Sequence, residues 1–232
     1  MIQKQGNWVR YELKPRNVKR HLFACEQLLE RQRRKGFLYR IVTKNGFITI
    51  TLSAENHEEF PAMLPRRRPN RIFNGSNVML CIWWDQLGVV YYELLKPTET
   101  ITGDQYRTQL MRLNRALKDK RPQYNERHDK VILQHDNARS HVAKVKTYLE
   151  TLKWEVLPHP PYSPDVAPSD YHLFRSMAHD LADQHFRSYE EVKNWIDSWI
   201  ASKDDQFFRR GIRMLPERWE KVVASDGQYF ES

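Results

Sequence analysis

The order of the apolar segments is the feature that most constrains how this chain can fold. Two extended apolar runs, residues 78–84 and 89–95, are joined by the tight turn Gln86-Leu87-Gly88 and predict a β-hairpin. An earlier run at residues 37–43 predicts a strand beside them. Residues 47–52 alternate Ile and Thr, which also suits a strand and could extend the edge of this first one. We therefore expect three antiparallel strands in the first part of the chain.

The second part alternates helices with strands. Helical periodicity is predicted for residues 16–34, 104–120 and 140–152, and short strands for 131–134 and 154–157. Four further helices are predicted over residues 170–183, 188–202, 205–214 and 216–224. A strand-helix-strand order favours parallel pairing with right-handed crossovers. The expected fold class is α/β, a mixed five-stranded sheet flanked by helices, which is the order of the ribonuclease H-like fold.

Composition limits the class of protein and its partners. The chain has 232 residues, 40% hydrophobic residues and seven Trp, which indicate one globular domain. No apolar run approaches the roughly 20 residues that span a bilayer, so we expect no membrane partner. Cys25 and Cys81 fall in apolar patterns typical of buried, reduced thiols, which favours a cytosolic or nuclear protein. The net charge of +9 favours a polyanion as partner.

Two carboxylates stand where a metal site would need them. Asp136 ends the apolar strand 131–134, and Asp170 opens the helix that follows a proline-rich loop. Taken singly, Asp136 is typical of a strand-end turn, and Asp170 of a first-turn acid favoured by the helix dipole. Together, a strand end and a helix start can bring both carboxylates to one Mg²⁺ or Mn²⁺, the chemistry of phosphodiester cleavage.

The residues around both carboxylates resemble the catalytic region of mariner-family transposases. The resemblance rests on residues 135–139 (HDNAR) and 162–170 (YSPDVAPSD), with support from residues 82–85, 154–161 and 218–223. It implies cut-and-paste DNA transposition: cleavage at terminal inverted repeats and strand transfer into a TA target. It also implies a nuclear location, DNA as partner, Mg²⁺ or Mn²⁺ as cofactor, and Asp136 and Asp170 as the second and third metal ligands.

The N-terminal residues resemble the linker between the two domains of the family. Residues 8–13 match its Trp-Val-Pro-His-Glu-Leu element, with Arg10 where Pro is usual. We therefore expect residues 1–15 to be a linker remnant and residues 16–232 to be the catalytic domain. The paired helix-turn-helix modules that read transposon ends are expected to be absent, and with them sequence-specific end binding.

The segment 44–77 departs from the family. After residues 40–43 the family has Gly-Asp-Glu-Lys-Trp, whose Asp is the first metal ligand, whereas this chain has Lys44-Asn45-Gly46. An amide offers an oxygen but no charge, so we expect weaker Mg²⁺ binding and an impaired enzyme. Two compensating frameshifts would explain the segment, a hypothesis that fails if no shifted frame of the coding DNA restores the motif. The segment includes the family's clamp loop, so the homodimer is expected to be weakened.

Other acids and the spacing complete the expected site. Asp85 ends the strand 78–84 and is expected to be structural, and Glu55, Glu58 and Glu59 lie in the aberrant segment. His135 precedes Asp136 on a strand, so it should face away from the metal and serve in packing. Thirty-three residues lie between Asp136 and Asp170, one fewer than usual in the family. One residue rotates a helix by about 100°, so we expect either that the packing of Val142, Val145 and Leu149 adjusts or that the intervening helix starts late.

The sequence leaves several functions open. The leading interpretation is a transposase catalytic domain impaired by the loss of its first Asp, so whether the chain is still an enzyme is undecided. A second is a non-catalytic DNA-binding or dimerising remnant, and a third is a translated fossil without a selected role. A fourth is a nuclease or integrase-like enzyme of the same fold. Metal dependence separates the first interpretation from the second, because both would bind DNA more weakly as salt rises.

Overall fold

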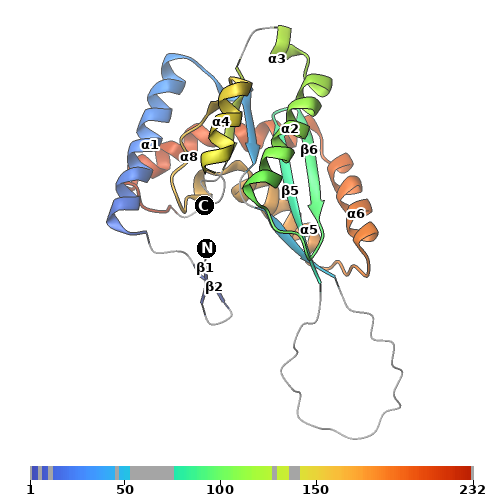
Figure 1. Cartoon of the computed structure of the whole chain (residues 1–232). Coiled ribbons are helices and arrows are strands. Elements are labelled where there is room, and N and C mark those ends of the chain that lie inside the picture. Colours follow the sequence, from blue (N-terminus) through green and yellow to red (C-terminus); the bar gives the residue numbers. More distant parts are fainter. Residues whose placement is uncertain are drawn as a thin grey trace, which may run out of the picture.

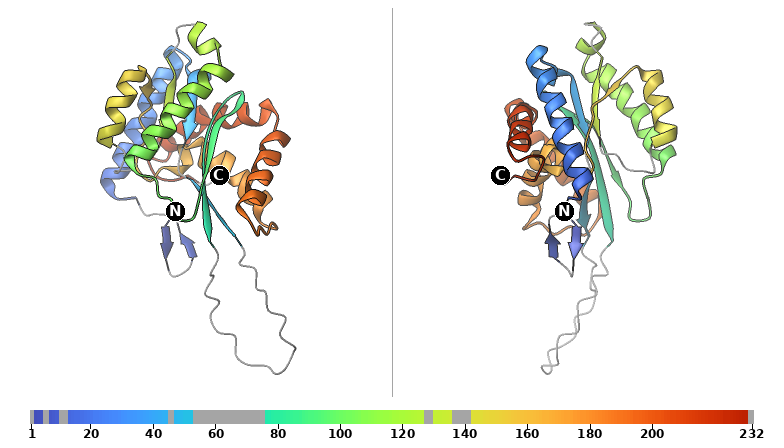
Figure 2. Two further views of the ribbon diagram at one scale, coloured as in Figure 1. Left: turned by 45° about the vertical axis from the view of Figure 1, so that its right-hand side comes forward. Right: turned by 90° about the vertical axis from the view of Figure 1, so that its left-hand side faces the viewer.

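The fold has three layers, with a β-sheet between two groups of helices (Figures 1 and 2). The computed structural model describes residues 2–4, 7–9, 13–44, 47–52, 76–126, 130–135 and 142–230. Helices α2 (Gly103–Lys120) and α4 (Val142–Leu152) cover one face of the sheet. Helices α1 (Pro15–Arg34) and α8 (Leu215–Ala224) lie on the other.

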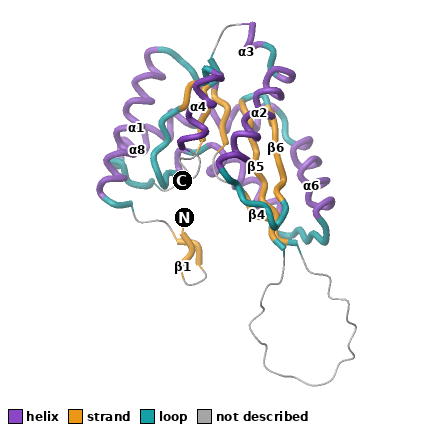
Figure 3. Tube along the Cα trace, viewed as in Figure 1, coloured by secondary structure: helices purple, strands orange, loops and turns teal. Residues whose placement is uncertain are grey.

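The sheet is mixed, as the sequence predicts, and runs through the centre of the molecule (Figure 3). Its strands are β3 (Ile41–Lys44), β4 (Ile48–Thr51), β5 (Asn77–Asp85), β6 (Gly88–Leu95), β7 (Ile132–His135) and β8 (Glu155–Val156). β5 pairs antiparallel with β3, β4 and β6, whereas β7 pairs parallel with β3 and with β8. The parallel pairs follow from the helical crossovers α2 and α4.

Strands β3 and β4 lie end to end along one edge of β5. Met79 pairs with Thr49 on one side and Leu95 on the other, and Trp84 likewise pairs with Thr43 and Val89. Since β6 occupies one edge of β5, both β3 and β4 must occupy the opposite edge. The six strands therefore form five ribbons in the order β6, β5, β3 with β4, β7 and β8, which confirms the predicted five-stranded sheet.

Three further helices follow β8 in the chain: α5 (Arg175–Leu181), α6 (Tyr189–Ser202) and α7 (Asp205–Arg213). A short helix, α3 (Gln123–Glu126), follows α2. Side-chain hydroxyls cap two of the helices: the Thr102 hydroxyl accepts from the Gln105 N–H at the start of α2, and the Ser188 hydroxyl accepts from the Glu191 N–H at the start of α6. A separate small hairpin joins β1 (Ile2–Lys4) to β2 (Asn7–Val9) in the region expected to be a linker.

The two faces of the sheet bury separate cores. Along β5, Leu80, Ile82 and Trp84 pack toward α1, α7 and α8, while Cys81 and Trp83 pack toward α2 and α4. Val145 and Leu149 of α4 are buried in the second core, so both residues still pack against the sheet. Cys25 and Cys81 are both buried, as the sequence predicts. No helix in the described part of the chain is long and apolar enough to cross a membrane.

Two predicted elements were wrong in part. The strand expected over residues 37–43 begins only at Ile41, because Leu38–Arg40 forms a 3-10 turn that buries Phe37 and Leu38 below α1. The helix expected over residues 170–183 begins as a π-helix, η4 (Ser169–Phe174), and becomes α-helical only in α5. Hydrophobic periodicity does not distinguish these wider or tighter turns from a regular element.

Candidate active site

The parallel pairing of β3 with β7 sets the position of the expected metal ligands. Ile41 pairs with Ile132, and the register runs to Lys44 opposite His135, where both strands end. Parallel strands end at the same edge of a sheet, so the chain leaves β3 and β7 at neighbouring points. Asn45 follows Lys44 directly and Asp136 follows His135, and both residues lie outside those that the structure describes.

Asp170 is carried by a turn and a π-helix that approach the same strands. The 3-10 turn η3 (Pro164–Val166) leads into η4, and the Asp170 N–H donates to the Ala167 carbonyl at 2.9 Å. Asp170 is half-buried at the second position of η4. π-helical turns are rare and frequently occur at functional sites. The carboxylate therefore stands at a helix start, as the sequence predicts.

Two buried hydrogen bonds hold the segment that carries Asp170 against the sheet, one from β7 and one from β5. The Gln134 side-chain amide donates to the Val166 carbonyl at 3.0 Å, linking β7 to η3. The Trp84 indole N–H donates to the Ser169 hydroxyl at 3.1 Å, linking β5 to the residue before Asp170. Neither contact was predicted from the sequence. Gln134 carried a signal, because it lies two residues before Asp136 on a strand and residues two apart share a face.

The oxygen atoms near these strand ends are of the kind that a hard divalent cation prefers. The Thr43 hydroxyl and the Gln134 carbonyl oxygen are buried, and neither has a hydrogen-bond partner among the described residues. Mg²⁺ and Mn²⁺ prefer such oxygen ligands and keep bound waters that can satisfy neighbouring oxygens. Within the described residues no three His, Cys, Asp or Glu side chains form a possible metal site. The residues present thus fit a metal only if Asp136 joins Asp170.

Lys44 and His135 lie on the opposite face of the sheet from the Asp170 helix. Lys44 is only 2% exposed, with its ammonium nitrogen 5.3 Å from the centroid of the Tyr106 ring. The His135 ring stacks on the same Tyr106 at 6.0 Å. Tyr106 belongs to α2, whereas Gln134 reaches the turn before Asp170. His135 is therefore a packing residue, as expected.

Asp85 does not provide the missing ligand. Its carboxylate is 1% exposed and accepts two hydrogen bonds from Arg121, at 2.8 Å from Nε and 3.0 Å from Nη2. It also accepts from the Leu87 N–H at 2.8 Å. These three donors occupy both oxygens, so Asp85 is structural, as expected. Glu55, Glu58 and Glu59 lie outside the described residues.

The nearby His172 is half-buried against Phe207. The His172 ring lies 4.4 Å from Phe207, and its Nε2 donates to the Phe207 carbonyl at 2.9 Å. Burial lowers the pKa of His172, and this hydrogen bond opposes the shift only in part.

A groove of about 510 Å³ lined by β6, α2 and α6 lies elsewhere and does not include Asp170. The candidate site is thus confined to the strand ends and η4.

Comparison with known proteins identifies the family. A sequence profile described as Transposase (partial DDE domain) matches residues 61–127. This match begins inside the segment 44–77, so the departure from the family does not extend over the whole of that segment. The Mariner Mos1 transposase of Drosophila mauritiana is 55% identical over 99% of this chain and 68% of its own length. Histone-lysine N-methyltransferase SETMAR of Homo sapiens is 33% identical over 99% of this chain and 34% of its own.

Solved structures agree with the sequence comparison. The catalytic domain of Mos1 mariner transposase superposes with a TM-score of 0.86 at 54% identity, covering 97% of this chain and all of that one. The Mos1 mariner paired end complex with Mn superposes with a TM-score of 0.84 at 55% identity, covering 99% of this chain and 68% of that one. These likenesses confirm the ribonuclease H-like fold. The chain belongs to the mariner family of transposases, and it corresponds to their catalytic domain.

Proposed function

We propose that this chain cleaves DNA and transfers DNA strands with the help of a divalent metal ion held by Asp136 and Asp170. The observation that carries the proposal is a convergence at one edge of the sheet: β3 and β7 end side by side, and buried hydrogen bonds hold η3 against β7 and η4 against β5. The family relationship supports the reaction, because Mos1 is a transposase of the same fold.

The residues of the site have separable roles. Asp136 and Asp170 would bind the ion, and the Thr43 hydroxyl and Gln134 carbonyl oxygen would orient its water ligands. With two Mg²⁺ or Mn²⁺ ions bound, one would activate the attacking oxygen and the other would stabilise the leaving oxygen. The Gln134 hydrogen bond holds β7, which leads to Asp136, against η3. The Trp84 hydrogen bond holds η4, which contains Asp170, against β5. Mos1 has been solved with Mn and with Mg, which supports either ion here.

Loss of the first carboxylate should impair the reaction. Asn45 stands where the family has its first metal-binding Asp, and an amide oxygen brings no negative charge to offset the ion. We propose that the affinity for metal is lower than in a site with three carboxylates, and that the rate of cleavage falls with it.

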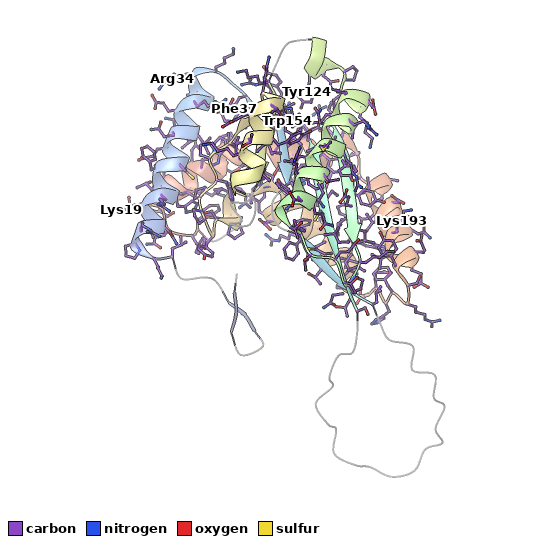
Figure 4. The ribbon with its side chains drawn as sticks, viewed as in Figure 1. Lys19, Arg34, Phe37, Tyr124, Trp154 and Lys193 are labelled. Atoms are coloured by element: carbon purple, nitrogen blue, oxygen red, sulfur yellow. The ribbon has the colours of Figure 1, made fainter. Side chains whose placement is uncertain are left out.

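DNA is the proposed partner, and α1 offers a surface for it. Lys14, Arg16, Lys19 and Arg20 are exposed at the start of this helix, and none of them forms an ion pair or side-chain hydrogen bond with another described residue. Lys19 lies on the outer side of α1 (Figure 4). Neighbouring unpaired cations attract DNA phosphates and release counterions on binding. The activity would take place in the nucleus. A homodimer weakened by the altered segment 44–77 remains part of the proposal.

Nicking of supercoiled plasmid tests the proposed activity. The purified chain is incubated with plasmid in Mn²⁺, in Mg²⁺ and in a chelator, beside Asp136→Ala and Asp170→Ala. Nicking that requires metal and disappears in both variants would support the proposal. Metal-dependent nicking that survives in either folded variant would contradict the assignment of its ligands.

A second candidate function is DNA binding without cleavage. Asn45 in place of the first Asp favours it, and so does the unpaired basic start of α1, which needs no metal to hold DNA. A folded protein that binds DNA equally well with and without Mn²⁺ and never nicks it would support this function over the first.

A further inference from the structure

We propose that Arg218 is a positioning residue for Asp170, contacting the backbone before this carboxylate and the side chain after it without touching the metal. The inference rests on the proposed role of Asp170 in metal binding. Arg218 lies on α8 and is only 6% exposed.

Arg218 contacts the segment before and after Asp170. Its Nη1 donates to the main-chain carbonyl of Asp165 at 2.8 Å, within the turn η3. Its guanidinium carbon lies 3.8 Å from the centroid of the Tyr171 ring, a cation-π contact with the residue directly after Asp170. The planar guanidinium can make both contacts at once, whereas the ammonium of a lysine can satisfy one at a time.

The same turn is held from α1. The Asp165 carboxylate lies 3.5 Å from Nε2 of His21, a fully buried side chain whose Nδ1 lies 3.0 Å from the Gly227 carbonyl oxygen. Burial raises the pKa of Asp165, while the nearby His21 and Arg218 oppose that shift. Two helices and the C-terminal turn therefore converge on the residues that lead into η4.

Stability alone does not explain this arginine. Its Nε is buried without a hydrogen-bond partner among the described residues, and so are both carboxylate oxygens of Asp165. Buried polar groups left unsatisfied cost free energy, and an apolar side chain of similar volume often serves stability as well or better. An arginine at this point is explained by the contacts it makes around Asp170, where a shift of about 1 Å would weaken a metal site.

Hydrogen exchange and metal binding test the proposal together. We would compare Arg218→Met and Arg218→Lys with the wild type, using Arg209→Met as control because Arg209 pairs with Asp205 near the surface of α7. Arg218→Met should leave the sheet amides of β5 protected and raise exchange in residues 163–174 at least tenfold. Arg218→Lys should be intermediate, and Arg209→Met should resemble the wild type.

The Mn²⁺ dissociation constant should rise at least tenfold in Arg218→Met and less in Arg218→Lys. Unchanged exchange in residues 163–174, or an equal rise throughout the chain, would overturn the positioning role. If the local exchange rises but no protein, wild type included, binds Mn²⁺, Arg218 positions the segment and the proposed metal function fails instead. If the local exchange rises and Mn²⁺ binding in Arg218→Met is unchanged, the effect of Arg218 on the metal site is refuted.

Discussion

Lys44 and His135 are register partners at the point where the parallel strands β3 and β7 end. The residues that follow them are Asn45, which is nearest to the first metal-binding Asp expected from the family resemblance, and Asp136, the proposed second ligand. Lys44 itself is buried against Tyr106 on the far face of the sheet. The Lys44 side chain is therefore accommodated on the α2 face of the sheet, and we propose that the change at position 45 is the one that affects metal binding.

Restoring the first carboxylate should strengthen metal binding. Asn45→Asp adds a charged oxygen ligand beside Asp136, so we expect the Mn²⁺ dissociation constant to fall at least about tenfold, or about 1.4 kcal/mol. Calorimetric titration with Mn²⁺ measures the effect. Asn77→Asp, at the exposed start of β5, is the matched control for the added charge. Equal changes in the two variants would show that position 45 is not at a metal site.

The basic start of α1 should determine the salt dependence of DNA binding. Replacing Arg16, Lys19 and Arg20 with Gln should reduce the slope of log affinity against log salt by about 2.7, if all three contact phosphates. The control replaces Lys118, Arg187 and Lys193, which are also exposed, and Lys193 lies across the molecule from Lys19 (Figure 4). Fluorescence anisotropy at several salt concentrations gives both slopes. If the slope falls equally in the α1 variant and in the control variant, α1 is not the DNA-binding surface.

The buried pair of Asp85 and Arg121 should contribute to stability. Asp85→Asn removes the charge that the 12% exposed Arg121 side chain needs, so we expect a loss of about 3–5 kcal/mol in the free energy of unfolding. Asp205→Asn removes the partner of Arg209 near the surface and should cost at most about 1 kcal/mol. Urea denaturation compares the two. A small effect at Asp85 would contradict the structural role assigned to it.

The Cys25 thiol should make stability fall at high pH. Burial, with smaller effects from Asp165 and Glu26, raises the pKa of Cys25 from 9.0 to about 12. The unfolded chain therefore releases this proton near pH 9 while the folded chain keeps it. Stability from this group is complete below pH 9 and is lost as pH rises toward 12, by about 1.4 kcal/mol at pH 10. In Cys25→Ala, the decrease in the free energy of unfolding between pH 8 and pH 10 should be smaller by this amount. An equal loss in the variant would refute it.

The sequence predicted the sheet well because its signals are local. Alternating apolar residues and the Gln86-Leu87-Gly88 turn mark β5 and β6, and Thr102 marks the start of α2. It could not predict that β3 and β4 share one edge of β5, since pairing between strands depends on the whole sheet. Nor could it predict the π-helix at Asp170, because one wider turn leaves no distinct periodicity.

Within the candidate site, only the proposed ligands could be predicted from the sequence. Asp136 and Asp170 are recognised from the residues beside them in sequence, whereas the supporting contacts join distant residues. Gln134 reaches Val166, Trp84 reaches Ser169, and Arg218 reaches Asp165. Each of these partners is set by packing between elements, which a single sequence does not encode locally.

Cleavage of the chain by bound iron tests the position of the metal most directly. Fe²⁺ would replace Mg²⁺ at an oxygen-rich site, and with ascorbate and peroxide it would cut the backbone near its ligands. We expect cuts in the peptides that contain Asp136 and Asp170, suppressed by excess Mn²⁺ and absent in Asp170→Ala. Cuts that fall elsewhere, or that persist in Asp170→Ala and in excess Mn²⁺, would contradict a metal site formed by these two carboxylates.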